Sequence, residues 1–205
     1  MNFKAAYQIL GTVPEDLLCE LTRQIQLIQS TDYNYSDKNI GSGEVSWSRV
    51  DFFATSQPPE PKKPLFDAMF AVANYCKAEC GLDRVNSASV STLAPFQTID
   101  EHTDGRFLHR ITNRYIVPLS HSDVNYNYGY YNGEKVIYPM VYGNIYRINN
   151  AIIHAANNFE SSERFNLLID TFDERLQQKF SQHPDILAAL TVFGVNKEFE
   201  KRLKV

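Results

Sequence analysis

The spacing of hydrophobic residues changes twice along the chain. Before residue 84 apolar residues recur mainly at helical intervals, and from about residue 84 to 172 short apolar runs alternate with polar residues as strands do. After Asp173 helical spacing returns. The pattern predicts one domain, residues 1–205, with a helical N-terminal part (about 1–83), a β-rich core (about 84–172) and a helical C-terminal extension (about 173–205).

Two helices are predicted in the N-terminal part. The first covers 14–30, where Pro14 suits the first turn, and the second covers 65–80 and ends at Gly81. Between them the chain is irregular over 31–63, apart from a short strand at 47–53, and both a substrate lid and an ordinary surface loop fit this stretch. Three short helices are expected after Asp173, at 175–180, 184–190 and 197–203.

The core has the pattern of an all-β fold. An Asn132-Gly133 pair between two strand-like runs predicts a tight hairpin turn. Strands are expected at 85–93, 96–100, 113–119, 126–131, 136–141, 143–149, 151–156 and 164–171. Short strands separated by turn signals predict a β-sandwich or a jelly roll, mainly β with flanking helices.

Composition narrows the function classes. The net charge of −4 provides no basic surface for nucleic acid, and no apolar run is long enough to span a membrane. The N-terminus lacks the features of a signal peptide, which favours a cytoplasmic protein. Cys19, Cys76 and Cys80 lie in predicted helices, and packed, reduced thiols explain them better than a metal site.

The candidate chemistry lies in four residues of the core. His102 and Asp104 form an H-x-D pair, which places both side chains on one face of an extended strand. With a distant third ligand, His154, they match the two-histidine, one-carboxylate set that holds non-haem Fe(II). Arg164, ten residues after His154, is placed to return a guanidinium to the same cavity and bind a carboxylate.

Each residue also has a plain structural interpretation. An H-x-D pair alone is often a surface histidine beside an aspartate, His154 on an apolar strand is often a hydrogen-bonded core histidine, and Arg164 could pair with a neighbouring carboxylate. The alternation Phe165, Leu167, Ile169 puts Arg164 on the opposite face of its strand. The combination of all four residues in strand-like sequence favours a metal site.

Between about Ser91 and Asp170 the chain resembles the aspartyl/asparaginyl β-hydroxylase branch of the Fe(II)/2-oxoglutarate-dependent oxygenases. The resemblance rests on the order and spacing of five segments. These are Ile99-Asp100-Glu101-His102-Thr103-Asp104-Gly105, Arg114-Tyr115-Ile116-Val117-Pro118-Leu119, Gly143-Asn144-Ile145-Tyr146-Arg147-Ile148-Asn149-Asn150, His154-Ala155-Ala156-Asn157 and Arg164-Phe165-Asn166-Leu167-Leu168-Ile169-Asp170.

The resemblance implies a double-stranded β-helix (a cupin-like jelly roll) and a set of roles. His102, Asp104 and His154 would bind Fe(II), and Arg164 would grip the distal carboxylate of 2-oxoglutarate. Two further residues, Arg114 and Ser91, match positions that contact the co-substrate in relatives. The implied enzyme is a dioxygenase that uses Fe(II), 2-oxoglutarate and O2 to hydroxylate a C–H bond and releases succinate and CO2.

Two other classes stay open at this stage. One is a non-catalytic jelly-roll binding module, and the other is a cupin-type metalloenzyme that does not use 2-oxoglutarate. The expected substrate is an amino acid, a peptide or another small molecule, with no nucleic acid or membrane partner. The C-terminal helices are expected either to pack on the sheet or to form a homodimer contact.

Overall fold

The computed structural model describes residues 5–27, 34–35, 47–53, 63–82, 85–104 and 112–172. Within these ranges the chain forms two helices and eleven strands. In chain order they are β1 (Tyr7–Thr12), α1 (Glu15–Gln26), β2 (Asn34–Tyr35), β3 (Trp47–Phe53), α2 (Lys63–Cys80), β4 (Val85–Leu93), β5 (Thr98–His102), β6 (Thr112–Pro118), β7 (Asn127–Tyr131), β8 (Glu134–Tyr138), β9 (Asn144–Ile148), β10 (His154–Asn157) and β11 (Arg164–Phe172).

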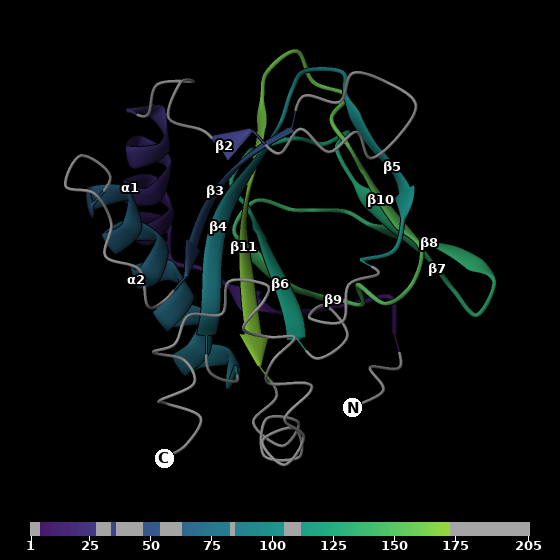
Figure 1. Ribbon diagram of the computed structural model, residues 1–205, viewed down its shortest axis with the longest axis horizontal. Helices are drawn as coiled ribbons and strands as arrows, with labels where there is room; N and C mark the ends of the chain where they lie inside the picture. Colours follow the sequence, from purple (N-terminus) through teal and green to yellow (C-terminus); the bar gives the residue numbers. More distant parts are fainter. Residues whose placement is uncertain are drawn as a thin grey trace.

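The strands form two antiparallel sheets that lie opposite each other (Figure 1). The larger sheet has the order β1-β9-β6-β11-β4-β3-β2, and the smaller has the order β5-β10-β7-β8. Strands that are neighbours in space are mostly distant in sequence, as in a jelly roll. The hairpin predicted at Asn132-Gly133 joins β7 to β8, and both turn residues have positive φ, 53° and 83°.

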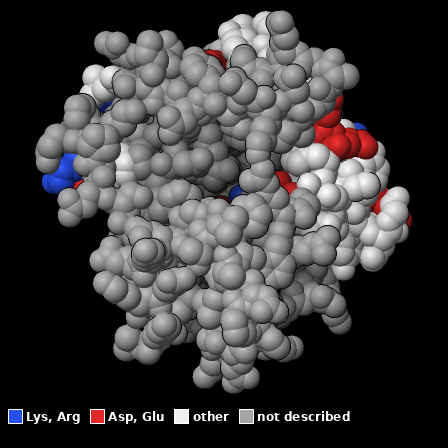
Figure 2. Space-filling view, in the orientation of Figure 1, with Lys and Arg blue, Asp and Glu red and all other residues white. Residues whose placement is uncertain are grey.

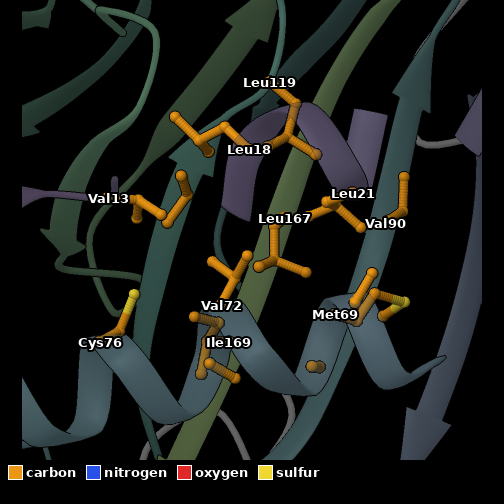
Figure 3. Close-up of a cluster of buried hydrophobic side chains, with 14 of the residues drawn as sticks. Val13, Leu18, Leu21, Met69, Val72, Cys76, Val90, Leu119, Leu167 and Ile169 are labelled. Carbon is orange, nitrogen blue, oxygen red and sulfur yellow. The ribbon is translucent and has the colours of Figure 1, made fainter. Parts of the chain in front are cut away.

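The two helices cover the outer face of the seven-stranded sheet (Figure 1). Leu18 and Leu21 of α1 and Met69 and Val72 of α2 pack with sheet residues that include Leu167 (Figure 3). Both helices were expected from their apolar spacing, although α1 is shorter than predicted and 28–30 lie outside the described residues. The apolar faces therefore bind the helices to the sheet and leave its other face for the interior.

A second core lies between the sheets. Its buried members come from the segment before β1, from strands of both sheets and from the turn after β8, and they are Ala6, Ile116, Tyr138, Met140, Tyr146 and Ile148. Alternation along β11 separates the two cores, because Leu167 and Ile169 face the helices. Arg164 and Asp170 consequently point between the sheets, where both are buried.

The N-terminal part also supplies β1, β2 and β3 to the larger sheet, and β3 lies where the short strand was predicted at 47–53. Strand β1 was not expected, because Tyr7–Thr12 shows no apolar alternation and its strand character comes from pairing with β9. All three cysteines lie on helices and are free thiols, as predicted. The helices predicted after Asp173 lie outside the described residues. Neither described helix is long and apolar enough to cross a membrane.

Candidate metal and co-substrate site

The two histidines meet across the smaller sheet. His102 ends β5 and is the direct antiparallel partner of His154, the first residue of β10. Their ring centroids lie 4.5 Å apart and both side chains are half-buried. The pairing of β5 with β10 therefore joins two residues that are far apart in the chain.

Backbone carbonyls set the tautomer of both rings. The Nδ1 atom of His102 lies 2.6 Å from the carbonyl oxygen of Asp100, and Nδ1 of His154 lies 2.9 Å from that of Ile152. Because a carbonyl oxygen only accepts, the neutral form of each ring carries its proton on Nδ1 and has its lone pair on Nε2. Burial lowers the pKa of His154 below its ordinary value, which favours the neutral ring that a metal needs.

Asp104 completes the cluster from just beyond the end of β5. Its backbone N–H donates to the carbonyl oxygen of Asn150, and its Oδ1 lies 3.7 Å from Nε2 of His102. One ligand atom from each of His102, Asp104 and His154 lies within 4.8 Å of the others. Three donors that converge from one side can hold a metal ion and leave its other coordination positions open.

The chemistry of these donors fits Fe(II). Two imidazole nitrogens and one carboxylate oxygen are a mixed set that suits non-haem iron, and the carbonyl partners of the histidines are the outer contacts that such ligands usually make. The three side chains are neither fully exposed nor sealed off. His102, Asp104 and His154 are thus brought together as the sequence predicted.

Arg114 connects the cluster to the larger sheet. Its NH1 donates to Oδ2 of Asp104 at 2.7 Å, while Nε and NH2 donate to the carboxylate of Asp170. Arg114, a residue predicted for the site, therefore lies beside the candidate metal ligands. Its contact with 2-oxoglutarate stays a prediction.

Arg164 lies at the opposite end of β11 from Asp170, deep between the sheets, and only 3% of it is exposed. Its NH2 donates to Oδ1 of Asn127 at 2.8 Å, and its NH1 donates to the carbonyl oxygens of Asn157 and Tyr126. No carboxylate pairs with it in the described part of the chain. Burial lowers the pKa of Arg164 to about 10, so the side chain is still cationic at neutral pH.

Two further polar atoms are buried between the sheets. Within the described part of the chain, the hydroxyl of Tyr138 and the amide oxygen of Asn166 have no hydrogen-bond partner. Ser91 is the direct strand partner of Asn166 and shares its inward face. Buried polar atoms without partners are rare in folded proteins, so these two atoms are unusual features of the interior.

A glycine leaves room for the Tyr138 side chain. A Cβ atom added to Gly129 would lie 2.2 Å from the Tyr138 hydroxyl oxygen, so only glycine leaves room for the ring. Gly129 is also the strand partner of His154. The Tyr138 hydroxyl therefore lies over the same part of the smaller sheet as a metal ligand.

The tyrosine-rich strand β7 has a second, outward face. The hydroxyls of Tyr128 and Tyr130 donate to Oε1 of Glu101 at 3.0 and 2.8 Å, and Lys135 lies 3.6 Å above the Tyr128 ring. Glu101 precedes His102 on β5 and so points away from the metal ligands. Figure 2 shows acidic side chains over this side of the molecule. The rings of Tyr128 and Tyr130 also contact each other edge to face, with centroids 6.1 Å apart.

The described residues include one further histidine, His121, which is not part of the cluster, whereas His183 lies outside them. His121 is exposed and stacks on Tyr142, with ring centroids 3.8 Å apart, and His109 lies outside the described residues. Sequence reasoning missed Tyr138 and Asp170 as site residues. For Asp170, the position on the same face of β11 as Arg164 was the available signal, whereas nothing in the sequence marks Tyr138.

A jelly roll with two histidines and a carboxylate between its sheets defines a non-haem iron oxygenase type of protein. The sequence profile of the aspartyl/asparaginyl beta-hydroxylase family matches residues 12–174. The chain belongs to this family, which confirms the predicted family and enzyme class, a 2-oxoglutarate-dependent hydroxylase. The predicted cofactors, Fe(II), 2-oxoglutarate and O2, are confirmed with it and agree with the His-Asp-His cluster.

Solved structures confirm the fold. A Pseudomonas putida prolyl-4-hydroxylase superposes with a TM-score of 0.57 at 14% identity and covers 82% of this chain and 93% of its own. A Trichoplax adhaerens prolyl hydroxylase, solved with a peptide fragment of hypoxia-inducible factor, gives 0.59 at 12% identity and covers 85% and 86%. A Burkholderia pseudomallei oxidoreductase of the 2OG-Fe(II) oxygenase family gives 0.57 at 11%, covering 80% and 83%. No curated protein sequence matches this chain.

Proposed function

We propose that this protein hydroxylates a C–H bond of an amino acid, a peptide or another small molecule, and that succinate and CO2 are its co-products. In this proposal His102, Asp104 and His154 hold Fe(II), and Arg164 binds the distal carboxylate of 2-oxoglutarate. When bound, the iron and the co-substrate supply the oxidising chemistry. The protein supplies the positions of both and a protected interior.

The observation that carries the proposal is the environment of Arg164. Among the described residues the Arg164 guanidinium is held by neutral oxygens and meets no counter-charge, and burial of an unpaired cation is costly. An anionic ligand in the interior would supply that charge. A dicarboxylate fits both ends of the site, because one carboxylate would pair with Arg164 and the other would reach the metal.

The spacing between the Arg164 end and the His154 end of the site supports a short dicarboxylate as the ligand. Asn127, which accepts from Arg164, lies two residues along β7 from Gly129, the partner of His154. Two residues of strand span about 7 Å, comparable to the length of a five-carbon diacid. The Tyr138 hydroxyl, which lies over Gly129 and has no partner among the described residues, is a suitable donor to the bound co-substrate.

The two alternatives make different demands on these residues. A binding module has no use for three converging metal donors, and a metalloenzyme without 2-oxoglutarate has no use for a buried cation beside them. Substrate choice is open between free amino acids, peptides and other small molecules. The peptide seen with the Trichoplax enzyme supports keeping peptides in this set.

The proposal is tested by anaerobic titration of the purified protein with Fe(II) and then 2-oxoglutarate. The expected result is a visible charge-transfer band that is lost in His154→Ala and weakened in Arg164→Met. His121→Ala, an exposed histidine, is the matched control and should keep the band.

Other outcomes of the titration point to the alternatives. Iron binding without a band would favour the metalloenzyme that does not use 2-oxoglutarate, and no iron binding would favour the binding module. If the band appears, candidate substrates are screened by succinate release. The predicted cytoplasmic location and the homodimer contact stay predictions.

A further inference from the structure

Within the described residues Arg164 is held by three acceptors, and Asn127 is the one that contributes a side chain. NH2 of Arg164 donates to Oδ1 of Asn127 at 2.8 Å, while NH1 donates to the backbone carbonyl oxygens of Asn157 and Tyr126. A guanidinium only donates, so the amide turns its oxygen toward Arg164 and its Nδ2 away. Asn127 is itself buried, with 8% exposed. All three acceptors are therefore neutral.

The two backbone acceptors are fixed by contacts of their own. The backbone N–H of Asn157 donates to the carbonyl oxygen of Tyr126 at 3.4 Å, and the N–H of Tyr126 donates to Oδ1 of Asn157 at 3.1 Å. The next residue, Asn158, is fully buried and its side chain donates to three backbone carbonyl oxygens. This part of the structure therefore fixes NH1 of Arg164 and adds no negative charge beside it.

The carboxylates nearest to Arg164 along β11 do not neutralise it. Glu163 precedes Arg164 and is exposed, whereas Asp170 lies at the other end of the strand and pairs with Arg114. Burial lowers the pKa of Arg164 to about 10, and a carboxylate beside the guanidinium would raise that pKa instead. In the described part of the chain, Arg164 is thus held in place while its charge is left without a partner.

The strand register puts Asn127 on the inward face of the smaller sheet. Asn127 is the direct partner of Tyr138 on β8 and of Ala156 on β10, and it lies two residues from Gly129, the partner of His154. Side chains two residues apart share one face of a strand, and direct partners share it as well. Asn127 therefore faces the same interior as a metal ligand.

An amide at position 127 can hold the guanidinium and still leave its charge for a ligand. An aspartate has nearly the same shape and would accept the same hydrogen bond, but it would also form a buried ion pair with Arg164. The carboxylate of an entering ligand would then compete with this internal partner and be repelled by it. The neutral amide avoids both effects.

We propose that Asn127 is a positioning residue that makes the site selective for a doubly charged co-substrate, because it fixes Arg164 without neutralising it. The inference rests on the proposed function, in which Arg164 binds the distal carboxylate of 2-oxoglutarate. A purely structural role for Asn127 would affect stability and would not change which 2-oxo acid binds. The two roles differ in the preference for 2-oxoglutarate over 2-oxopentanoate, which has the same carbon chain without the distal carboxylate.

The experiment is an anaerobic titration of the full-length Fe(II) protein with each 2-oxo acid, followed by the visible charge-transfer band. Both compounds carry the 2-oxo acid end that binds the metal, so both report by the same band. Asn127→Asp is expected to weaken 2-oxoglutarate binding by about 100-fold or more and to change 2-oxopentanoate binding by about 2-fold or less. Without ligand its Tm should lie about 2–4 °C above that of the parent, because Arg164 gains a charged partner.

Asn132→Asp is the matched control. It adds the same charge to the same hairpin, but at the exposed turn between β7 and β8. Asp-Gly suits this turn as well as Asn-Gly does, so the fold is retained. Both 2-oxo acids should bind this variant as they bind the parent.

Asn127→Ala separates the holding of Arg164 from the neutralising of its charge. Arg164 loses one acceptor but keeps its charge, so 2-oxoglutarate binding should weaken by only about 3- to 10-fold and the preference over 2-oxopentanoate should remain. Alanine is then less harmful than aspartate, although aspartate keeps the hydrogen bond. A purely structural role predicts the opposite order. Because this variant introduces no charge, it tests the inference even if Asn127→Asp does not fold.

Three results would overturn the inference. They are the parent affinity for 2-oxoglutarate in folded Asn127→Asp or in Asn127→Ala, weaker 2-oxoglutarate binding by Asn127→Ala than by Asn127→Asp, and loss of the preference for 2-oxoglutarate in Asn127→Ala. These results leave the proposed function intact. A parent protein that binds both 2-oxo acids equally well would instead overturn the role of Arg164, and the proposed function with it.

Discussion

The most informative single substitution is Arg164→Met, which removes a buried charge but keeps most of the side-chain volume. In the parent protein a bound carboxylate would meet a guanidinium that is only 3% exposed. Loss of one partner of a buried, hydrogen-bonded charge pair costs about 2–5 kcal/mol, or roughly 30- to 5,000-fold in Kd for 2-oxoglutarate. Metal affinity should not change, because Arg164 does not contact His102, Asp104 or His154 in the described structure.

Thermal denaturation measures this loss without substrate turnover. With Mn(II) present and 2-oxoglutarate at 100 times the parent Kd, binding should stabilise the parent by about 2.7 kcal/mol, which raises its Tm by about 5–11 °C. The same concentration should raise the Tm of Arg164→Met by about 3 °C or less. Without ligand the variant should stay folded, because the lost hydrogen bonds are offset by removal of the buried charge.

Arg147→Met is the control for this measurement. Arg147 also donates to an asparagine, Asn113 at 2.8 Å, but it lies on the same face of β9 as Ile145, which packs against the helices. Its variant should keep the full 2-oxoglutarate shift. If Arg164→Met shows the parent shift as well, Arg164 does not bind the co-substrate and the reasoning from its buried charge is wrong.

Four further substitutions test other parts of the structure. His102→Ala should abolish Fe(II) binding, measured by metal analysis after desalting, while circular dichroism stays that of the parent. Tyr138→Phe should raise the KM for 2-oxoglutarate by up to about 10-fold through loss of one hydrogen bond, with unchanged Fe(II) affinity. Gly129→Ala should destabilise the fold by about 1–3 kcal/mol in urea denaturation, and Tyr138→Phe should relieve part of this because it removes the atom that the new methyl meets. Leu167→Ala, in the core between helices and sheet (Figure 3), should cost about 2–5 kcal/mol, and a loss below 1 kcal/mol would contradict the observed burial.

The elements that depend on local pattern were predictable from the sequence. Helix α2 shows its apolar spacing over the whole of Lys63–Cys80, and Asn132-Gly133 marks its hairpin because both residues adopt positive φ at low cost. Strand β1 was not predicted, because Tyr7–Thr12 carries no local signal and becomes a strand by pairing with β9. Pairing partners more than a hundred residues away leave no trace in a short window.

The site residues also divide into features with a local sequence signal and features that depend on long-range contacts. The sequence by itself determined the donor types and the separation of Arg164 from Leu167 and Ile169 onto opposite faces of the strand, because residue identity and the two-residue period of a strand are local properties. That the Arg164 face looks between the sheets was decided by the tertiary structure. Only the tertiary structure decided that His102 faces His154, that Arg114 is shared by Asp104 and Asp170, and that the Tyr138 hydroxyl lies over Gly129. These contacts depend on the register between strands, and register is set by packing of the whole sheet.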